Sequence, residues 1–597
     1  MLKLFKYLKR HEIFQILICV VLVAGQVWLN LKLPDFMNDI TRHLETEGST
    51  MHDILISGFK MLLCALGSGV LAVITGYFAA RVATSFSKDL RERVFAKTLG
   101  FSMAEINQFS TASLITRSTN DITQVQQIFA MGLQVMIQAP ILAVWAIIKI
   151  LGIGWEWSMA TVVAVLVLLV IITIIVTVAL PKFKIIQKLT DNLNRVTREQ
   201  LIGIRVVHAY NAEKYEEAKF EDANEELMAT NLFTNRTMAI MMPGITLIMQ
   251  GLTLSVYLIG ARLINNAAIP TLAELGTGSS DRVILFSNMV VFTAYAMQVI
   301  MAFMLLAMTF IMLPRAAVSA KRINEVLETP LTIKEGTITE SPEDKEGEIE
   351  FRNVSFRYPD AEEAVLENIS FKAHKGETIA FIGSTGSGKS TLINLIPRFY
   401  DVTDGEVLVD GIDVRKYTQE ALLSKIGYVS QKAILFTGTV TSNVDFGENG
   451  EHQLTEFGVQ RAIEIAQGKD FVEKMENTYE AEIAQGGTNV SGGQRQRLSI
   501  ARAIGRNPEI FIFDDSFSAL DYKTDRVLRS VLKKETAGST NLIVAQRIGT
   551  IKDADKIIVL DEGKLVGMGT HRELLKGCQT YQEIAYSQLS KEELENE

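Results

Sequence analysis

The chain has 597 residues, of which 48% are hydrophobic and 21% are charged, and its mean hydropathy is +0.20. This balance excludes a disordered chain and favours a protein that is partly embedded in a membrane. The net charge of −9 offers no basic excess for nucleic acid, and three widely separated cysteines exclude a disulfide framework or a zinc site as the organising principle.

The apolar residues concentrate before Pro330. The clearest run, Met159–Leu180, carries no charge and is long enough to cross a bilayer as a helix. With five weaker runs, the sequence predicts six membrane-spanning helices. These five runs are Ile13–Leu33, Ile54–Ala80, Ile128–Ile153, Met238–Leu263 and Val283–Leu313. The first run also fits a cleaved signal peptide, but the five spans that follow favour a membrane helix.

The loops between these spans differ in charge from one side to the other. Basic residues precede the first span and follow the second and fourth. The opposite loops are acidic, and residues 263–281 contain neither Lys nor Arg. The positive-inside rule then predicts a multi-pass membrane protein with both termini in the cytoplasm.

Two long polar stretches on the inner side, 81–122 and 182–236, have a helical pattern with many i,i+4 charge pairs. We expect helices that continue past the membrane and end in turns near Met103–Phe109 and Val207–Lys214. Such turns would carry contacts to a domain beneath the membrane. The alternative is a plain solvated loop at each place.

Two further features of the spans have no assigned role. Five methionines of the sixth span share one helical face and fit either an adaptable wall for apolar ligands or ordinary packing. Lys60 and Lys149 lie inside apolar spans. A lysine there either has a function or extends its side chain so that the ammonium group lies at the membrane interface. The methionines are Met297, Met301, Met304, Met308 and Met312.

The composition changes after residue 330. We predict a membrane domain over 1–330, a polar linker over 331–347, a soluble α/β domain over 348–590 and a short tail over 591–597. Within the soluble domain, a β-type run at Glu377–Ile382 is followed by a glycine-rich loop and a helical pattern. Its strand–loop–helix order is the context that the phosphate loop G-x-x-x-x-G-K-[ST] requires.

The glycines of this loop let backbone N–H groups surround phosphates at a helix N-terminus. We expect Lys389 to reach the β- and γ-phosphates of ATP and the Ser390 hydroxyl to ligate Mg²⁺. The predicted nucleotide-binding residues of the loop are Gly383, Ser384, Thr385, Gly386, Ser387, Gly388, Lys389, Ser390 and Thr391.

A second acidic signal lies at Glu509–Asp515, where an apolar strand ends in two carboxylates. Parallel strands present such groups at the edge of the sheet where ligands bind. We expect Asp514 to hold Mg²⁺ and Asp515 to face the attacking water.

The segment that begins at Val490 reads V-S-G-G-Q-R-Q-R and resembles the signature loop of ATP-binding-cassette (ABC) ATPases. The order of the other motifs also fits this family, and the resemblance covers essentially the whole chain. Six spans followed by one cassette is the layout of an exporter half-transporter. The resemblance therefore implies an all-α polytopic membrane domain followed by an α/β phosphate-loop NTPase, and it requires a second chain.

The same resemblance implies roles for residues outside the phosphate loop. Tyr358 would stack on adenine, although such a residue is more often a packed strand aromatic. Gln431 would complete the metal shell, and Asp521 would make a cross-dimer contact, cap a helix, or do both. The signature would clamp the γ-phosphate bound to the partner; its residues are Ser491, Gly492, Gly493 and Gln494.

Two positions depart from the family pattern. Asp515 stands where the family ordinarily has Glu, and Gln546 stands at the switch position that ordinarily holds His. Asp is shorter than Glu by about 1.5 Å, and Gln cannot carry a proton as His can. The pair suggests a site that binds ATP but hydrolyses it poorly.

This combination resembles one half of the heterodimeric multidrug exporters of bacteria, in which one chain carries degenerate catalytic residues and an intact signature. The resemblance implies a location in the lipid bilayer of a bacterial cell membrane and a partner half-transporter with Glu, His and an altered signature. It also implies export of amphipathic or hydrophobic compounds out of the cell. A lipid or lipid-linked flippase and a nucleotide-gated membrane regulator that does not pump are the rival interpretations.

Overall fold

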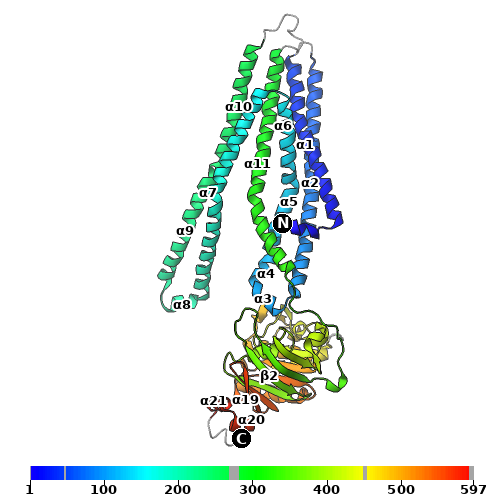
Figure 1. Cartoon of the computed structure of the whole chain (residues 1–597), viewed down its shortest axis with the longest axis vertical. Coiled ribbons are helices and arrows are strands. Elements are labelled where there is room, and N and C mark those ends of the chain that lie inside the picture. Colours follow the sequence, from blue (N-terminus) through cyan, green and yellow to red (C-terminus); the bar gives the residue numbers. More distant parts are fainter. Residues whose placement is uncertain (1, 46–48, 268–280, 448–453, 590–597) are drawn as a thin grey trace. The chain divides into compact units, whose positions relative to one another are not determined.

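The computed structural model describes residues 2–45, 49–267, 281–447 and 454–589, so the predicted tail at 591–597 lies outside the described residues. The chain forms two compact units, of which the first comprises Met1–Thr98 and Ala112–Thr329. The second comprises Leu99–Thr111 and Pro330–Glu597 (Figure 1). A short segment within the membrane half of the sequence therefore belongs to the second unit.

The first unit is helical, and its described residues include six helical stretches that are long and apolar enough to cross a membrane. The prediction of six spans is confirmed. The long helices are α1 (Arg10–Glu45), α2 (Met51–Leu99), α5 (Asn120–Met131), α6 (Ile137–Leu151), α7 (Trp155–Ile202), α9 (Glu213–Ala239), α10 (Met241–Asn266) and α11 (Asp281–Glu328). The short ones are η1 (Leu2–Tyr7), α4 (Thr111–Ser118), α8 (Ile204–Ala209) and the π-helical turn η2 (Gly132–Met136), which joins α5 to α6.

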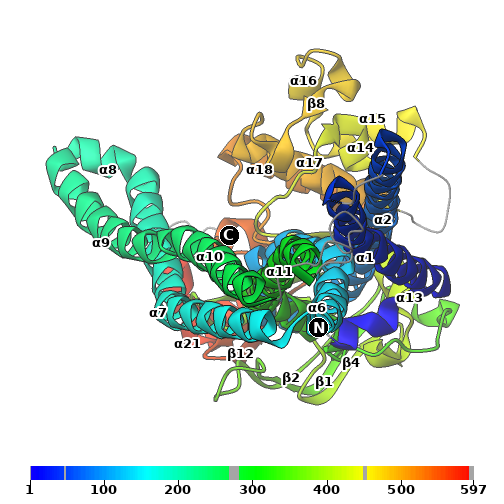
Figure 2. The ribbon, with the colours of Figure 1, turned by 90° about the horizontal axis from the view of Figure 1, so that it is seen from above.

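Helices α1, α6, α7, α10 and α11 share an apolar core in which Trp157 packs against Phe292 with ring centroids 5.7 Å apart. Beyond this core α7 and α9 run side by side as an arm, with α8 at its end (Figure 2). On α11, Met304 packs against the core and Met301 is exposed. The side chains of Met308 and Met312 lie outside the described residues, so the role of the methionine face stays open.

The second unit contains a six-stranded sheet with the order β12-β11-β3-β10-β9-β6, parallel except for the β11–β12 pair. A second, antiparallel sheet has the order β2-β1-β4-β5. The strands are β1 (Ile349–Phe356), β2 (Leu366–Ala373), β3 (Thr378–Gly383), β4 (Asp404–Val409), β5 (Ile412–Asp413), β6 (Ile426–Val429), β7 (Gly438–Thr439), β8 (Glu482–Ile483), β9 (Ile510–Asp514), β10 (Thr540–Val544), β11 (Lys556–Asp561) and β12 (Lys564–Gly569).

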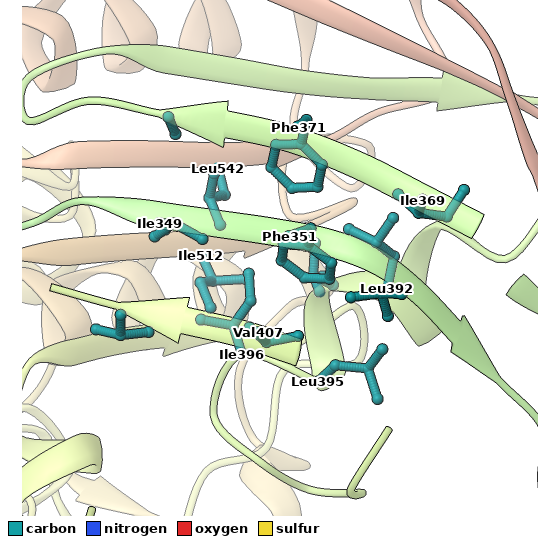
Figure 3. Packing of buried hydrophobic residues seen from close by; sticks show 14 of the residues in the cluster. Ile349, Phe351, Ile369, Phe371, Leu392, Leu395, Ile396, Val407, Ile512 and Leu542 are labelled. Carbon is teal, nitrogen blue, oxygen red and sulfur yellow. The ribbon is translucent and has the colours of Figure 1, made fainter. Parts of the chain in front are cut away.

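Burial alternates along β1 and β2 except where the register shifts, and Phe351 stacks on Phe371 with ring centroids 4.6 Å apart. Figure 3 shows these rings among side chains of both sheets, with Ile512 and Leu542 coming from the parallel sheet. Leu392 of the helix after β3 joins the same core, which fixes the loop between that strand and that helix.

The helices of the second unit surround these sheets, and one group forms a separate apolar core around α14, α15, α17 and α18. The helices are α3 (Met103–Phe109), α12 (Lys389–Asn394), α13 (Gln419–Ser424), α14 (Val440–Val444), α15 (Glu456–Ile465), α16 (Lys469–Val472), α17 (Gly492–Gly505), α18 (Tyr522–Glu535), α19 (Ile548–Ile551), α20 (His571–Gly577) and α21 (Gln579–Gln588), with short 3₁₀ turns at Glu343–Lys345, Val414–Lys416, Thr478–Glu480 and Gln485–Gly487.

Helix α3 is the segment of the membrane half that belongs to this unit. Its first turn is closed by a capping box between Ser102 and Glu105. The buried Glu105 carboxylate also accepts a hydrogen bond from the backbone N–H of Thr332, at 2.8 Å. Asn107 donates to the hydroxyl of Tyr400 at 3.1 Å. The turn that the sequence places near Met103–Phe109 is thus a capped helix that holds the start of the linker.

Candidate functional site

The phosphate loop lies between β3 and α12. Gly388, the residue before α12, has φ +91°, and a Cβ there would meet the backbone O of Val365 at 3.1 Å. Only glycine fits both demands without strain. Lys389 turns back over the loop, and its Nζ donates to the carbonyl oxygens of Gly383 at 3.0 Å and Ser384 at 2.7 Å. Burial lowers the pKa of Lys389, opposed by Asp515 and Asp514 nearby.

The next residue, Ser390, points to the carboxylate at the end of β9. Its hydroxyl donates to Asp514 Oδ1 at 2.8 Å. Asp514 is 5% exposed, and burial raises the pKa of its carboxyl, as does the neighbouring charge of Asp515. A buried carboxylate with a raised pKa gains from a cation beside it.

The donor set at this place fits Mg²⁺ held together with a nucleotide. No group of three or more His, Cys, Asp or Glu side chains is arranged as a metal cage in the described part of the chain. Mg²⁺ ordinarily takes one or two protein oxygen ligands and completes its shell with water and substrate phosphates. The Ser390 hydroxyl and the Asp514 carboxylate offer such oxygens.

The strand order brings three separate segments to one edge of the sheet. β10, β9 and β6 are neighbours and parallel, and Gln546, Asp515 and Gln431 each follow directly or two residues after the end of one of them. Gln546 Nε2 donates to Asp515 Oδ2 at 3.0 Å, and Gln431 Nε2 approaches the same oxygen at 3.4 Å. Asp515 itself has φ +45°, in the left-handed region.

The Asp515 carboxyl has a raised pKa because it is partly buried, although the hydrogen bonds of Gln431 and Ser518 and the charges of Arg547 and Lys389 act in the other direction. Its carboxylate lines a cavity of about 270 Å³ beside the phosphate loop. The cavity is lined by Val365, Thr385, Gly386, Gly388, Lys389, Ser390, Thr391, Gln431, Asp514, Asp515, Val544 and Gln546.

The signature segment does not line this cavity. Ser491 is the N-cap of α17: its hydroxyl accepts from the backbone N–H of Gln494 at 3.3 Å, and Gln494 Oε1 accepts from the backbone N–H of Ser491 at 2.8 Å. Ser491 and Gly492 are exposed, and apart from its chain neighbours and the backbone of its own helix no described atom lies within 4 Å of a Cβ built on Gly492. The helix therefore presents an open N-terminus to the surface, where an anion is favoured.

Two more of the predicted site residues take structural roles within the chain. Asp521 caps α18 by accepting from the backbone N–H of Thr524 at 3.0 Å. The Tyr358 ring packs edge-on against Tyr400 with centroids 5.2 Å apart, and its hydroxyl shares a hydrogen bond of 3.0 Å with Thr391. Tyr358 is not among the described residues that line the cavity.

Sequence reasoning missed several residues that shape the site. Val365, in the bend before β2, and Val544, at the end of β10, line the cavity, but neither valine belongs to a recognisable sequence motif. Arg502 holds the segment after Gln431, because its guanidinium donates to the backbone O of Asn443 at 2.7 Å and of Ile434 at 3.1 Å. Glu105 left a readable signal, since Ser102-x-x-Glu105 is a capping-box pattern.

A phosphate loop, a buried carboxylate at a strand end and an exposed signature helix, following six membrane helices, define a membrane protein with a nucleotide-binding ATPase domain. Two family patterns match the chain: the ABC transporter transmembrane region over residues 12–303 and the ABC transporter pattern over residues 366–518. An uncharacterized ABC transporter ATP-binding protein of Mycobacterium tuberculosis is 40% identical over 534 residues, which are 89% of this chain and 88% of the relative. The chain belongs to the ABC transporter family, as a half-transporter with an N-terminal membrane domain and a C-terminal ATPase.

Other relatives extend this comparison. The uncharacterized ABC transporter ATP-binding protein YfiB of Bacillus subtilis is 35% identical, covering 91% of both chains. An ATP-dependent lipid A-core flippase of Pseudomonas aeruginosa is 31% identical, covering 88% of this chain and 84% of the relative. The solved structure of a bacterial Atm1-family ABC exporter with ATP bound has a TM-score of 0.74 at 23% identity, covering 96% and 98% of the two chains. That likeness shows that the fold is the one of this exporter family.

Proposed function

We propose that this chain is one subunit of a heterodimeric ATP-driven exporter, in which its own ATP site hydrolyses poorly and its signature serves the competent site on the partner. The observation that carries the proposal is the contact of Gln546 and Gln431 with one oxygen of Asp515. The two residues that depart from the family pattern occupy one place, at the edge of the sheet where the attacking water would be activated.

The chemistry of these side chains argues for slow hydrolysis. An Asp in place of Glu shortens the reach toward the water by about 1.5 Å, and a misplacement of about 1 Å at a reacting centre costs on the order of a hundredfold in rate. Gln546 donates a hydrogen bond but cannot accept and pass on a proton. The amides of Gln546 and Gln431 also occupy the Asp515 oxygen that would otherwise accept a hydrogen bond from the attacking water.

The residues expected to bind ATP, in contrast, are all present in the chain. The backbone of the phosphate loop, Lys389 and the N-terminus of α12 would hold the phosphates, while Ser390, Asp514 and Gln431 would hold Mg²⁺. Mg²⁺ supplies neutralising charge on the phosphates. Tyr358 would turn its ring to the base. Thr385, Ser384 and Ser387 complete the loop, and Asp521 would reach across the dimer.

The intact signature is the second half of the proposal. Ser491, Gly492, Gly493 and Gln494 lie at an exposed helix N-terminus that no group of the chain's own phosphate loop approaches among the described residues. An exposed anion site of this kind suits the γ-phosphate bound to a partner chain. Closure of two such cassettes on ATP would shift the membrane helices from inward to outward access, and hydrolysis at the competent site would reset them.

The predicted orientation, with both termini in the cytoplasm, fits an exporter that takes amphipathic compounds from the cell or the inner leaflet. A second candidate is a flippase for lipids, which the named activity of the Pseudomonas aeruginosa relative favours. A third candidate, a nucleotide-gated regulator, would share the slow site but would not transport.

The first test is purification of this chain alone and with its partner. The chain alone should bind ATP but show little vanadate-sensitive hydrolysis, because self-pairing builds two sites that both contain Asp515 and Gln546. Vigorous hydrolysis by the lone chain would overturn the proposal. Transport in liposomes by the co-purified pair, with drugs and with labelled lipids as substrates, then separates a drug exporter from a flippase and from a regulator.

A further inference from the structure

Two neighbouring helices of the first unit carry the same short pattern. α1 contains Trp28-x-x-x-Lys32 and α6 contains Trp145-x-x-x-Lys149. The helices pack side by side, and all four side chains line one cavity of about 340 Å³ together with Leu31, Asp35 and Ile148. Lysine and tryptophan one helical turn apart lie on the same helix face, so each helix presents one indole below one ammonium.

The depth of these residues matches the edge of a bilayer. Lys32 and Lys149 stand within the last residues of the apolar runs Ile13–Leu33 and Ile128–Ile153. Tryptophan and lysine are enriched at this level, where indole rings and ammonium groups meet lipid headgroups. Below them α1 exposes Leu17 and Val21, and α6 exposes Val144, which offers an apolar surface for acyl chains.

The polar groups of the cavity are organised but not saturated. Lys149 Nζ lies 2.9 Å from Asp35 Oδ2, and Lys32 Nζ lies 3.4 Å from the same oxygen, so two cations share one anion. The Tyr295 hydroxyl shares its one proton between the backbone O of Leu31, at 2.9 Å, and the Asp35 carboxylate, and this contact helps to hold that carboxylate in place. The side chains of the two lysines are partly exposed, Lys32 by 39% and Lys149 by 41%.

The two indoles have free donors as well. Trp157 donates its indole N–H to the backbone O of Val256 at 3.1 Å, whereas neither Trp28 nor Trp145 donates to another described residue. The cavity thus combines a net positive charge, unused N–H donors and an apolar approach. A ligand complementary to all three features is an anion that carries acyl chains.

We propose that this cavity between α1 and α6 binds the phosphate headgroup of an anionic phospholipid, with Lys32 and Trp145 as direct contacts and with Asp35 as an internal anion that competes with the phosphate for the two lysines. The site is independent of the ATP site and of the proposed transport activity. Its lipid would be a bound component of the membrane domain rather than the transported compound.

The test is a titration of the full-length chain in detergent with dioctanoyl phosphatidylglycerol, dioctanoyl phosphatidylcholine and inorganic phosphate, read by native mass spectrometry and by tryptophan fluorescence. One phosphatidylglycerol should bind per chain, more tightly than phosphatidylcholine. Lys32→Gln and Trp145→Phe should each weaken binding by about fivefold, the effect of losing one charge or one hydrogen bond at a membrane surface.

Two further variants distinguish a loss of lipid binding from a general loss of folding. Asp35→Asn removes the competing anion and should tighten phosphatidylglycerol binding, a gain that misfolding cannot produce. Lys60→Gln removes an exposed lysine of α2 that lies outside the cavity and should leave binding unchanged. Equal binding of the two lipids, equal effects of Lys32→Gln and Lys60→Gln, or displacement of the lipid by inorganic phosphate would each overturn the proposal.

Discussion

Gln546 donates through Nε2 to Asp515 Oδ2 across 3.0 Å, so the two residues that depart from the family pattern are in direct contact. They lie 31 residues apart in sequence and meet because β9 and β10 are adjacent parallel strands. A change at one of them alters the partner of the other. Their effects on hydrolysis should therefore be coupled rather than additive.

The double replacement Asp515→Glu with Gln546→His should raise hydrolysis at this site only modestly. Glu restores reach and His restores a group that accepts a proton, but the partner signature that closes the site would still be altered. The backbone at residue 515 is also left-handed, which Asp tolerates better than Glu. The measurement is ATPase activity of the heterodimer whose partner Glu is changed to Gln. Recovery of the full wild-type rate would show that the partner's signature is sound and would contradict the proposed division between a slow and a competent site.

Replacement of Ser491 by Glu should lower turnover of the heterodimer by about a hundredfold or more, the cost of losing a preorganised donor to the transferred phosphate. Lys389→Ala should lower turnover less, because it acts on the slow site. At that site it removes the hydrogen bonds from Nζ to the loop carbonyls, so nucleotide binding there should weaken. Both variants are compared in one ATPase assay, with nucleotide binding as a second readout. A larger loss for Lys389→Ala would show that the two sites are assigned in reverse.

Asp515→Asn should raise the thermal stability of the nucleotide-free chain at pH 7 by a few degrees at most. Burial raises the pKa of the Asp515 carboxyl, so its ionised form disfavours the fold above that pKa, and the cost vanishes as pH falls toward the value of an unfolded Asp. The gain should therefore be present at pH 7 and lost near pH 4. Melting curves across this range test the sign, with Asp360→Asn at an exposed site as the control.

Glu105→Gln should loosen the link between α3 and the linker. One Gln cannot accept from the backbone N–H groups of both Ser102 and Thr332 as the carboxylate does, and an unpaired buried donor costs about 1–3 kcal/mol. We expect ATPase activity to persist while transport in liposomes falls. The matched control is Glu221→Gln on the exposed face of α9. A parallel loss of both activities would argue for a general defect in folding.

Much of the fold follows from local patterns. The six spans follow from apolar length, and the phosphate loop and the strand before Asp514 follow from motif and context, since each is specified by neighbouring residues. The meeting of Gln431, Asp515 and Gln546 depends on the order of strands in the sheet, which the sequence does not encode locally. The pairing of Lys149 with Asp35, 114 residues apart, is of the same kind. Sequence motifs therefore predict which residues belong to the candidate ATP site, whereas the contacts between these residues depend on the order of the strands in the sheet.

The position of α3 in the second unit has a consequence for the order in which the chain is made. Glu105 leaves the ribosome 227 residues before Thr332, its hydrogen-bond partner, and Asn107 precedes Tyr400 by 293 residues. Several membrane helices are synthesised in that interval, so α3 must wait with its binding surface missing until the ATPase sheets have folded. Docking of α3 is then a late step of biogenesis, and a lesion in the distant β-sheet core would first show as protease cleavage near residue 105.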